Sequence, residues 1–166
     1  MRQDGHLGVM PRTGAGLAAG VAGTLAIQQT MKAGARWLPA TQAPLRGDAG
    51  RYAVRQVEKR LPGPVQERVP ERARELGALS AHLAYGASAG AFYALLRPRG
   101  GNVLRDGVVL GLAVWAAGYL GWLPRAGLLP PVSQHTAPQL LGELGHHAMY
   151  GIATAAAFTG VARLLD

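Results

Sequence analysis

The sequence predicts an all-α membrane protein with four transmembrane helices, built as a tandem duplication of a two-helix hairpin with a pseudo-twofold axis along the membrane normal. Four windows without Asp, Glu, Lys or Arg are each long enough to cross a bilayer. Only 16% of the residues are charged, and many of the 24 glycines lie inside these windows, as is common in membrane helices. Two motifs also recur along the chain. The windows are 13–31, 76–96, 107–124 and 144–162.

The first helix is expected over 13–38. This helix ends in the polar stretch "IQQTMKAGARWLP", so Lys32 and Arg36 must extend to the membrane interface. A cleaved signal peptide is the alternative for this segment. However, no small-x-small cleavage site follows a compact apolar region, and the Trp-Leu-Pro that starts at Trp37 recurs at Trp122. We therefore expect the segment to belong to the mature fold.

A basic segment over 40–75 follows. In "AGRYAVRQVEKRL" apolar residues alternate with Arg and Lys, and the prolines at 62, 64 and 70 divide the second half of the segment into short pieces. It predicts one or two amphipathic helices within 49–75 that lie on anionic lipid headgroups. A solvated, charge-paired loop is an equally open alternative. The net charge of +8 comes mainly from Arg beside apolar segments, which favours membrane lipids as partners and no nucleic acid.

The second half of the chain is more apolar. Helices are expected over 76–97, 103–124 and 142–165, and the third helix contains the most apolar stretch, "GVVLGLAVWAAGYLGWL". A nearly uncharged, proline-rich loop over 125–140 separates the last two helices. We expect this loop to pack over the helix ends, with His135 as a surface residue.

The duplication is visible in "LGALSAHLAYG" and "LGELGHHAMYG", which share Leu, Gly, Leu, His, Tyr and Gly at a constant offset. Each copy follows a Trp-Leu-Pro and a loop. Because each unit has two helices, both units enter the membrane from the same side, which makes them parallel repeats.

The repeated motif places polar groups on the second helix of each unit. Residues at helical spacing form two stripes, and small residues mark where helices touch, so we expect the stripes to face each other. The candidate polar layer is His82, Tyr85, His147 and Tyr150. The candidate helix-packing residues are Gly86, Gly90 and Gly151.

Three roles for this layer stay open. The simplest is structural, with the tyrosines hydrogen-bonding the two histidines across the bundle. A proton or ion path is the second, although no carboxylate lies in a helix centre; Glu143, at the start of the last helix, is placed to pair with His146 or His147. Ligation of haem by two histidines is the third. The chain has no cysteine and no enzyme motif, so no cofactor, metal site or catalytic residue is expected.

The stretches "HLAYGASAGAFYALL", "GLAVWAAGYLGWLPRAGLLPP" and "GHHAMYGIATAAAF" resemble the YagU-like group of small bacterial inner-membrane proteins of unknown function. The resemblance runs from Gly77 to the C-terminus. It implies a multi-pass inner-membrane protein with both termini in the cytoplasm, and it implies no reaction. The basic 40–75 segment departs from the low-charge external loop of that group, and it draws most Lys and Arg to its own side. The orientation therefore stays open.

We predict a single membrane domain over 1–166 that acts as a non-enzymatic structural or membrane-associated component. A small transporter or proton-linked channel, with a homodimer as a further option, is the alternative. A continuous polar path would favour transport, and a dry, closed bundle would favour the structural role.

Overall fold

The computed structural model describes residues 8–97 and 101–165, and all regular secondary structure in these ranges is helical. The predicted all-α fold is therefore confirmed. Four long helical segments dominate the described part of the chain. They are α1 (Val9–Trp37), α4 (Glu71–Leu96), α5 (Val103–Ala116) with its continuation through η2 (Ala117–Trp122) and α6 (Leu123–Arg125), and α7 (Ala137–Leu165).

The helix ends follow from local sequence. α1 stops at Trp37 because Leu38 precedes Pro39 and leaves the helical region, with φ −137° and ψ 59°. α4 begins at Glu71, earlier than the expected start at 76, because the residues after Pro70 are strong helix formers. α7 likewise begins at Ala137 instead of 142, since Pro138 is tolerated in a first helical turn.

The third helix is interrupted by the π-helical segment η2. Pro124 follows this segment and has no N–H to donate to the preceding turn, so a regular α-helix cannot continue unchanged. A π-helical turn widens the helix and rotates the side chains around it. In η2 it carries Tyr119 into the interior, where the side chain is only 4% exposed.

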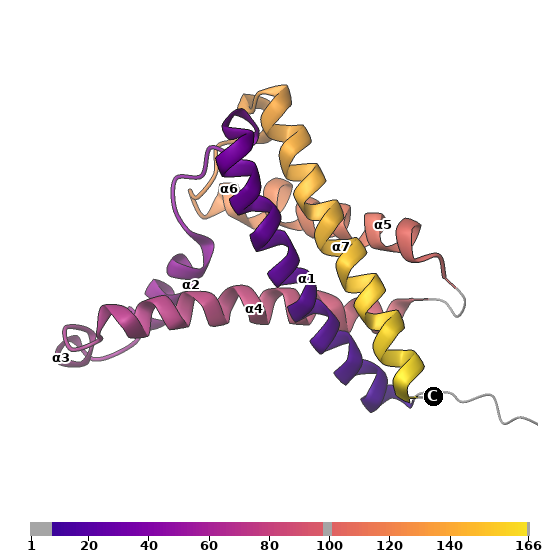
Figure 1. The fold of residues 1–166 in the computed structure, drawn as a ribbon. Helices are drawn as coiled ribbons and strands as arrows, with labels where there is room; N and C mark the ends of the chain where they lie inside the picture. The colour runs from indigo at the N-terminus through magenta and orange to yellow at the C-terminus, as the bar shows by residue number, and fades with distance from the viewer. Residues whose placement is uncertain (1–7, 98–100, 166) are drawn as a thin grey trace, which may run out of the picture.

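Figure 1 shows α1 and α7 side by side and antiparallel, with α4 crossing α1 and α5 crossing α7. Glycines allow both crossings. A Cβ on Gly20 would overlap the carbonyl oxygen of Gly86, and a Cβ on Gly111 would overlap that of His147. Backbones at this spacing pack through small residues, as in membrane helix pairs.

Two segments are long and apolar enough to cross a membrane, Val103–Arg125 and Ala137–Leu165. Only 28% of each apolar window is buried, so most of its side chains are at least partly exposed, unlike those of the core helix of a soluble protein. Large apolar side chains are also exposed on α1 and α4, where Leu17 and Phe92 are 43% and 65% exposed.

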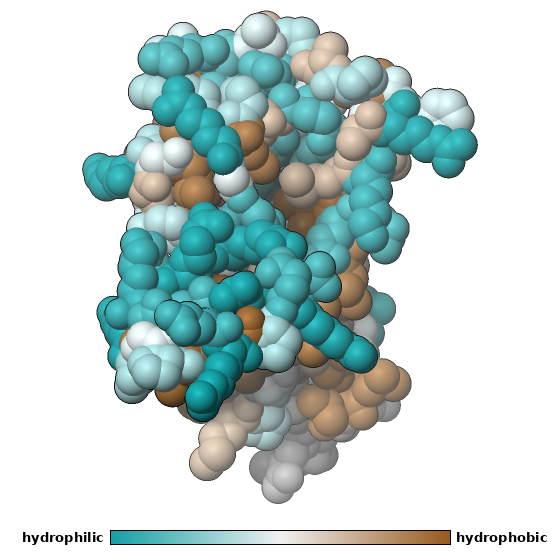
Figure 2. Space-filling view, turned by 90° about the vertical axis from the view of Figure 1, so that its left-hand side faces the viewer, coloured by the Kyte–Doolittle hydropathy of each residue, from teal (hydrophilic) through white to brown (hydrophobic). Residues whose placement is uncertain are grey.

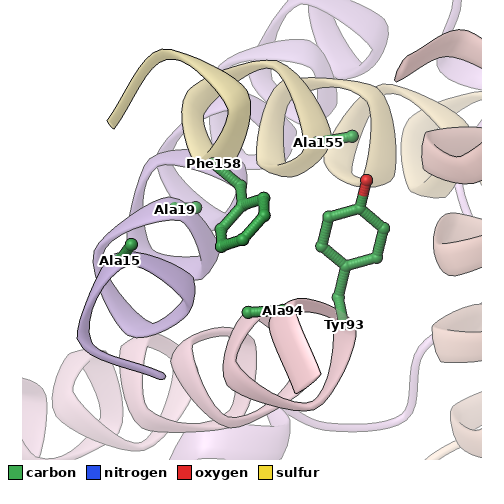
Figure 3. Packing of buried hydrophobic residues seen from close by; sticks show 6 residues of the cluster. All are labelled: Ala15, Ala19, Tyr93, Ala94, Ala155 and Phe158. Atoms are coloured by element: carbon green, nitrogen blue, oxygen red, sulfur yellow. The ribbon is translucent and has the colours of Figure 1, made fainter. Parts of the chain in front are cut away.

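The apolar core lies between α1, α4 and α7, near the start of α1 and the end of α7. Figure 3 shows Tyr93 and Phe158 among small alanines of three helices, and the two rings meet edge to face at 5.8 Å between centroids. This contact joins the end of α4 to α7. The tight packing depends on Ala15, Ala19 and Ala155, which are at most 3% exposed.

Arginines close this end of the molecule. The Arg12 guanidinium donates to the carbonyl oxygens of Ala94 and Arg97, which are otherwise unsatisfied at the end of α4. Arg97 donates to Thr159 at 2.6 Å and lies 3.7 Å from the Asp106 carboxylate. Buried or half-buried charges thus join the start of α1, the end of α4, the start of α5 and the last turns of α7.

The basic 40–75 segment forms η1 (Pro39–Thr41), α2 (Ala49–Glu58) and α3 (Gly63–Gln66), which confirms short helices within 49–75. α2 packs on α4 and does not extend away from the bundle. Asp48 caps its N-terminus by accepting from the Arg51 N–H at 2.7 Å. Arg51 pairs with Glu71 and Arg74 pairs with Glu58, which ties α2 to the start of α4.

The loop between α6 and α7 packs over the helix ends, as expected. Leu128 and Leu129 join Tyr119 and Leu123 in a second buried cluster, and η3 (Val132–Gln134) follows. His135 is not the surface residue that the sequence suggested. It is half-buried, with its ring edge to face with Tyr119 at 6.2 Å, because the two prolines before η3 direct the loop back onto η2.

Candidate functional site

A cavity of about 580 Å³ lies between α1, α2, α4, η2 and α7. This volume falls within the roughly 300–1,000 Å³ of typical small-molecule sites. Most of the wall is apolar. Two further sets of side chains line it, one ionisable and one aromatic. The ionisable set is Lys32, Asp48, His82, Glu143 and His147. The aromatic set is Tyr85, Tyr119, Trp122 and Tyr150.

The cavity has an inner and an outer end, which differ in exposure. Glu143 is 1% exposed and Tyr150 is 3% exposed, so both lie at the inner end. The side chains of His82 and Asp48 are 39% and 47% exposed, and Lys32 is exposed as well. The outer end is therefore accessible, while the inner end is closed.

Glu143 is the central group of the inner end. Its Oε1 accepts from the backbone N–H of Ala43 at 3.1 Å, and its Oε2 accepts from the Tyr119 hydroxyl at 2.5 Å. The sequence placed this residue at an interfacial helix start, but α7 begins a full turn earlier, so Glu143 lies inside the fold. The predicted histidine neighbours are present, with the Nδ1 atoms of His146 and His147 at 3.8 and 4.0 Å from its oxygens.

His147 has a defined tautomer when neutral. Its Nδ1 lies 2.8 Å from the carbonyl oxygen of Glu143, and a carbonyl only accepts, so Nδ1 carries the proton and donates. Nε2 is then the basic nitrogen of the ring. The ring also packs edge to face against Tyr119, with the centroids 5.5 Å apart. His147 thus combines a fixed orientation with a free lone pair beside the cavity.

His82 has a different partner. Its Nε2 lies 3.1 Å from Oδ2 of Asp48, the residue that caps α2. Partial burial would raise the pKa of Asp48, but hydrogen bonds from the Arg51 N–H and from His82 outweigh it and hold the pKa below its ordinary value of 3.8. The pair fixes α2 against α4. The two helices are so close here that a Cβ added to Gly50 would lie only 2.8 Å from the Cδ2 atom of His82.

The two tyrosines of the predicted layer do not hydrogen-bond the histidines, contrary to expectation. The Tyr150 hydroxyl donates to the carbonyl oxygen of Gly86 at 2.8 Å, across the bundle. Tyr85 is 45% exposed and packs against Trp122, with ring centroids 6.4 Å apart. The expectation was wrong because Asp48 and the helix backbone lie nearer to the two imidazoles than the phenols do.

The structure brings together most of the predicted residues. His82, Tyr85, Gly86, His147 and Tyr150 all line the cavity. Gly90 and Gly151 lie outside the wall, at the α1–α4 and α5–α7 crossings, where neighbouring backbone fills the space of a Cβ. They are packing positions, as predicted.

Sequence reasoning missed two groups, Asp48 and Tyr119. Asp48 precedes an amphipathic segment and was readable as a helix cap, but its contact with His82 depends on how α2 docks. Tyr119 lay in the most apolar window, and only the π-helical turn directs it to Glu143.

The geometry also bears on metal and haem ligation. Within the described ranges, no group of three His, Asp or Glu side chains has the arrangement of a metal site. A haem iron would have to displace Asp48 from Nε2 of His82, so the histidine pair does not fit axial ligation well. The arrangement favours hydrogen bonding, ion pairing and proton transfer at the inner end.

Comparisons with protein-family models, curated proteins and solved structures find no match to this chain.

Proposed function

We propose that the chain is a four-span membrane protein that takes up a small, largely apolar molecule in the cavity, as a binding or transport protein. The cavity carries this proposal, because it is open at one end, mostly apolar, and polar only at defined points. A purely structural bundle would be dry and closed, which is why we prefer binding over the structural role.

Four spans are supported by the dimensions of α1 and α4. These helices have 29 and 26 residues, more than the approximately 20 needed to span a hydrocarbon core. Both expose large apolar side chains, and both pack by glycine contacts like those of α5 and α7. The matching glycine crossings at Gly86 and Gly151 also support the tandem duplication.

The resemblance to the YagU-like group supports a bacterial inner membrane, with both termini in the cytoplasm. In a four-span arrangement the termini share one side, and the loops before α4 and α7 share the other. The outer end of the cavity then opens on the loop side.

Anionic lipid remains the proposed partner of the basic segment. Hydrophilic side chains gather over α2, α3 and the start of α4, the face toward the viewer in Figure 2. Exposed Arg55 lies on α2, and the exposed side chains of Lys59, Arg60 and Arg68 lie in the turns that follow α2 and α3. Each Lys or Arg near an anionic surface contributes about 1 kcal/mol to the free energy of membrane binding, and salt screens this attraction.

A proton relay is the second candidate. It is favoured by two contacts of the Glu143 carboxylate at the inner end: the hydrogen bond from the Tyr119 hydroxyl, and the His147 Nδ1 atom 4.0 Å from Oε2. Such a relay would use the cavity as the entry path for water. Acid-driven proton flux in liposomes, lost in Glu143→Gln, would distinguish this role from uptake of an apolar molecule.

Binding is tested with a substitution that fills the cavity with a large side chain from its wall. A neutral, polarity-sensitive naphthalene dye should bind the purified protein in lipid nanodiscs, and Val114→Trp should abolish binding because Val114 lines the cavity. Val109→Trp is the matched control, since Val109 lies on the same helix but is 62% exposed. Equal binding by both variants would disprove a ligand site in this cavity.

A further inference from the structure

The inner end of the cavity holds a carboxylate without a permanent cation beside it. Glu143 is 1% exposed, and within residues 8–97 and 101–165 no Lys or Arg nitrogen lies within 4.0 Å of its oxygens. The nearest charged candidates are two imidazoles, and His147 already uses its Nδ1–H on a backbone carbonyl. A buried carboxylate is costly unless a cation compensates it.

Both oxygens of Glu143 accept from neutral donors, the Ala43 amide and the Tyr119 hydroxyl. An ionised carboxylate has about four lone-pair sites, so capacity for a further donor remains. Because Glu143 lines the cavity, that donor can come from a bound molecule. Charge-assisted N⁺–H···O⁻ bonds are roughly twice as strong as neutral ones.

The remaining wall suits a cation with an apolar body. Tyr119, Trp122 and Tyr150 present aromatic rings, whose faces attract ammonium groups. The other carboxylate, Asp48, is already paired with His82 at the outer end, and the single lysine on the wall is exposed there. An anionic head group at the inner end would instead be repelled by the negative charge of Glu143.

We propose that the cavity binds an organic ammonium ion with an apolar body, with its ammonium group on Glu143 and its body against the apolar and aromatic wall. This inference rests on the proposed function, because it names the ligand class of the same cavity. The ligand enters from the outer end, past Asp48 and His82, and replaces water at the inner end.

The experiment compares three probes that share one apolar body: 4-phenylbutylammonium, 4-phenylbutanol and 4-phenylbutanoate. Binding is measured by calorimetry on the full chain in zwitterionic nanodiscs, with empty nanodiscs subtracted. The ammonium should bind at least about tenfold more tightly than the alcohol, the size of one hydrogen bond to a charged group, and the carboxylate should bind most weakly. A carboxylate that binds most tightly would overturn the proposal.

Glu143→Gln should remove the preference for ammonium, so that the ammonium and the alcohol bind this variant about equally, because the amide carries no charge. Glu75→Gln is the matched control, because this exposed glutamate on α4 does not line the cavity. Should Glu143→Gln fail to fold, the order of the three probes on the wild type decides alone. Equal binding of all three overturns the ammonium assignment but leaves the cavity as a binding site. Binding of none, together with no effect of Val114→Trp on the dye, overturns both.

Discussion

At the residue scale, Glu143 joins three parts of the fold. Its oxygens accept from Ala43 of the first loop and from Tyr119 of η2, while its own backbone is part of α7. Buried polar groups of this kind stabilise a fold only when each hydrogen bond is formed. The arrangement therefore fixes the relative position of segments that are distant in sequence.

Tyr119→Phe tests this role. The ring and its packing are kept, but Glu143 loses one of its two donors, so the free energy of unfolding should fall by about 1–3 kcal/mol. Denaturant unfolding in detergent measures the change. Tyr85→Phe is the control, because that tyrosine is 45% exposed and should change stability little. Equal stability of the two variants would mean that the Tyr119–Glu143 bond contributes nothing.

The docking of α2 should depend on pH through Asp48. Its pKa is lowered in the fold, so its contribution is complete above the ordinary value of 3.8 and is lost as the pH falls through the lowered value. The charged or titratable groups facing it are Arg51 from α2 and His82 from α4. Spin labels at Arg55 on α2 and Leu79 on α4 should therefore keep their distance between about pH 7 and 4, and should separate only as the pH falls further below 3.8.

Asp48→Asn provides the control for that measurement, because it removes the titrating carboxyl and keeps a capping side chain. The distance in this variant should not change across the same acidic range. Separation of α2 in both proteins at the same pH would assign the effect to other carboxyl groups, such as Glu71 or Glu75 beside Arg51.

At the element scale, the helix pairs depend on glycines that bring backbones together. At Gly20 and at Gly111 the neighbouring atom is a carbonyl oxygen of the crossing helix, which cannot rotate away as a side chain would. A methyl group there must separate the helices. The two helix pairs, α1 with α4 and α5 with α7, therefore pack in the same way.

Gly20→Ala should destabilise the protein by about 1–3 kcal/mol, the usual result of overpacking, and Gly111→Ala should do the same in the second hairpin. Gly14→Ala is the matched control on α1, since nothing lies within 4 Å of its added Cβ. It should be neutral or slightly stabilising, because Ala favours helix more than Gly does. Thermal unfolding in detergent measures these changes. Equal stability of all three variants would contradict close packing at the two crossings.

At the scale of the whole molecule, the number of spans is open to a direct measurement. The chain has no cysteine, so each introduced thiol reacts alone. With four spans, Glu67→Cys and Ser133→Cys should react with an impermeant maleimide on one side of the membrane, and Arg105→Cys on the other. If only Val103–Arg125 and Ala137–Leu165 cross, Glu67→Cys should react on the same side as Arg105→Cys.

Much of the fold follows from local sequence. The long helices follow from apolar windows, and their ends follow from prolines such as Pro39, because both effects act over a few residues. The early start of α4 was missed because the charge of its first turn suggested a loop, although those residues favour helix and pair with α2. In the candidate site, His82 and His147 were found from the repeat, while Asp48 and Tyr119 were not.

The sequence by itself predicted that the chain is helical, that small residues mark the helix contacts, and that the two histidines lie on facing stripes; it did not predict the cavity that both histidines line. These properties depend on periodicity, composition and spacing, which are local. Only the tertiary structure decided which partner each polar group has. His82 pairs with Asp48 and Glu143 with Tyr119 because α2 docks on α4 and η2 turns the third helix. Pairings between distant segments depend on packing of the whole chain, and equal motifs in a repeat therefore acquire different partners.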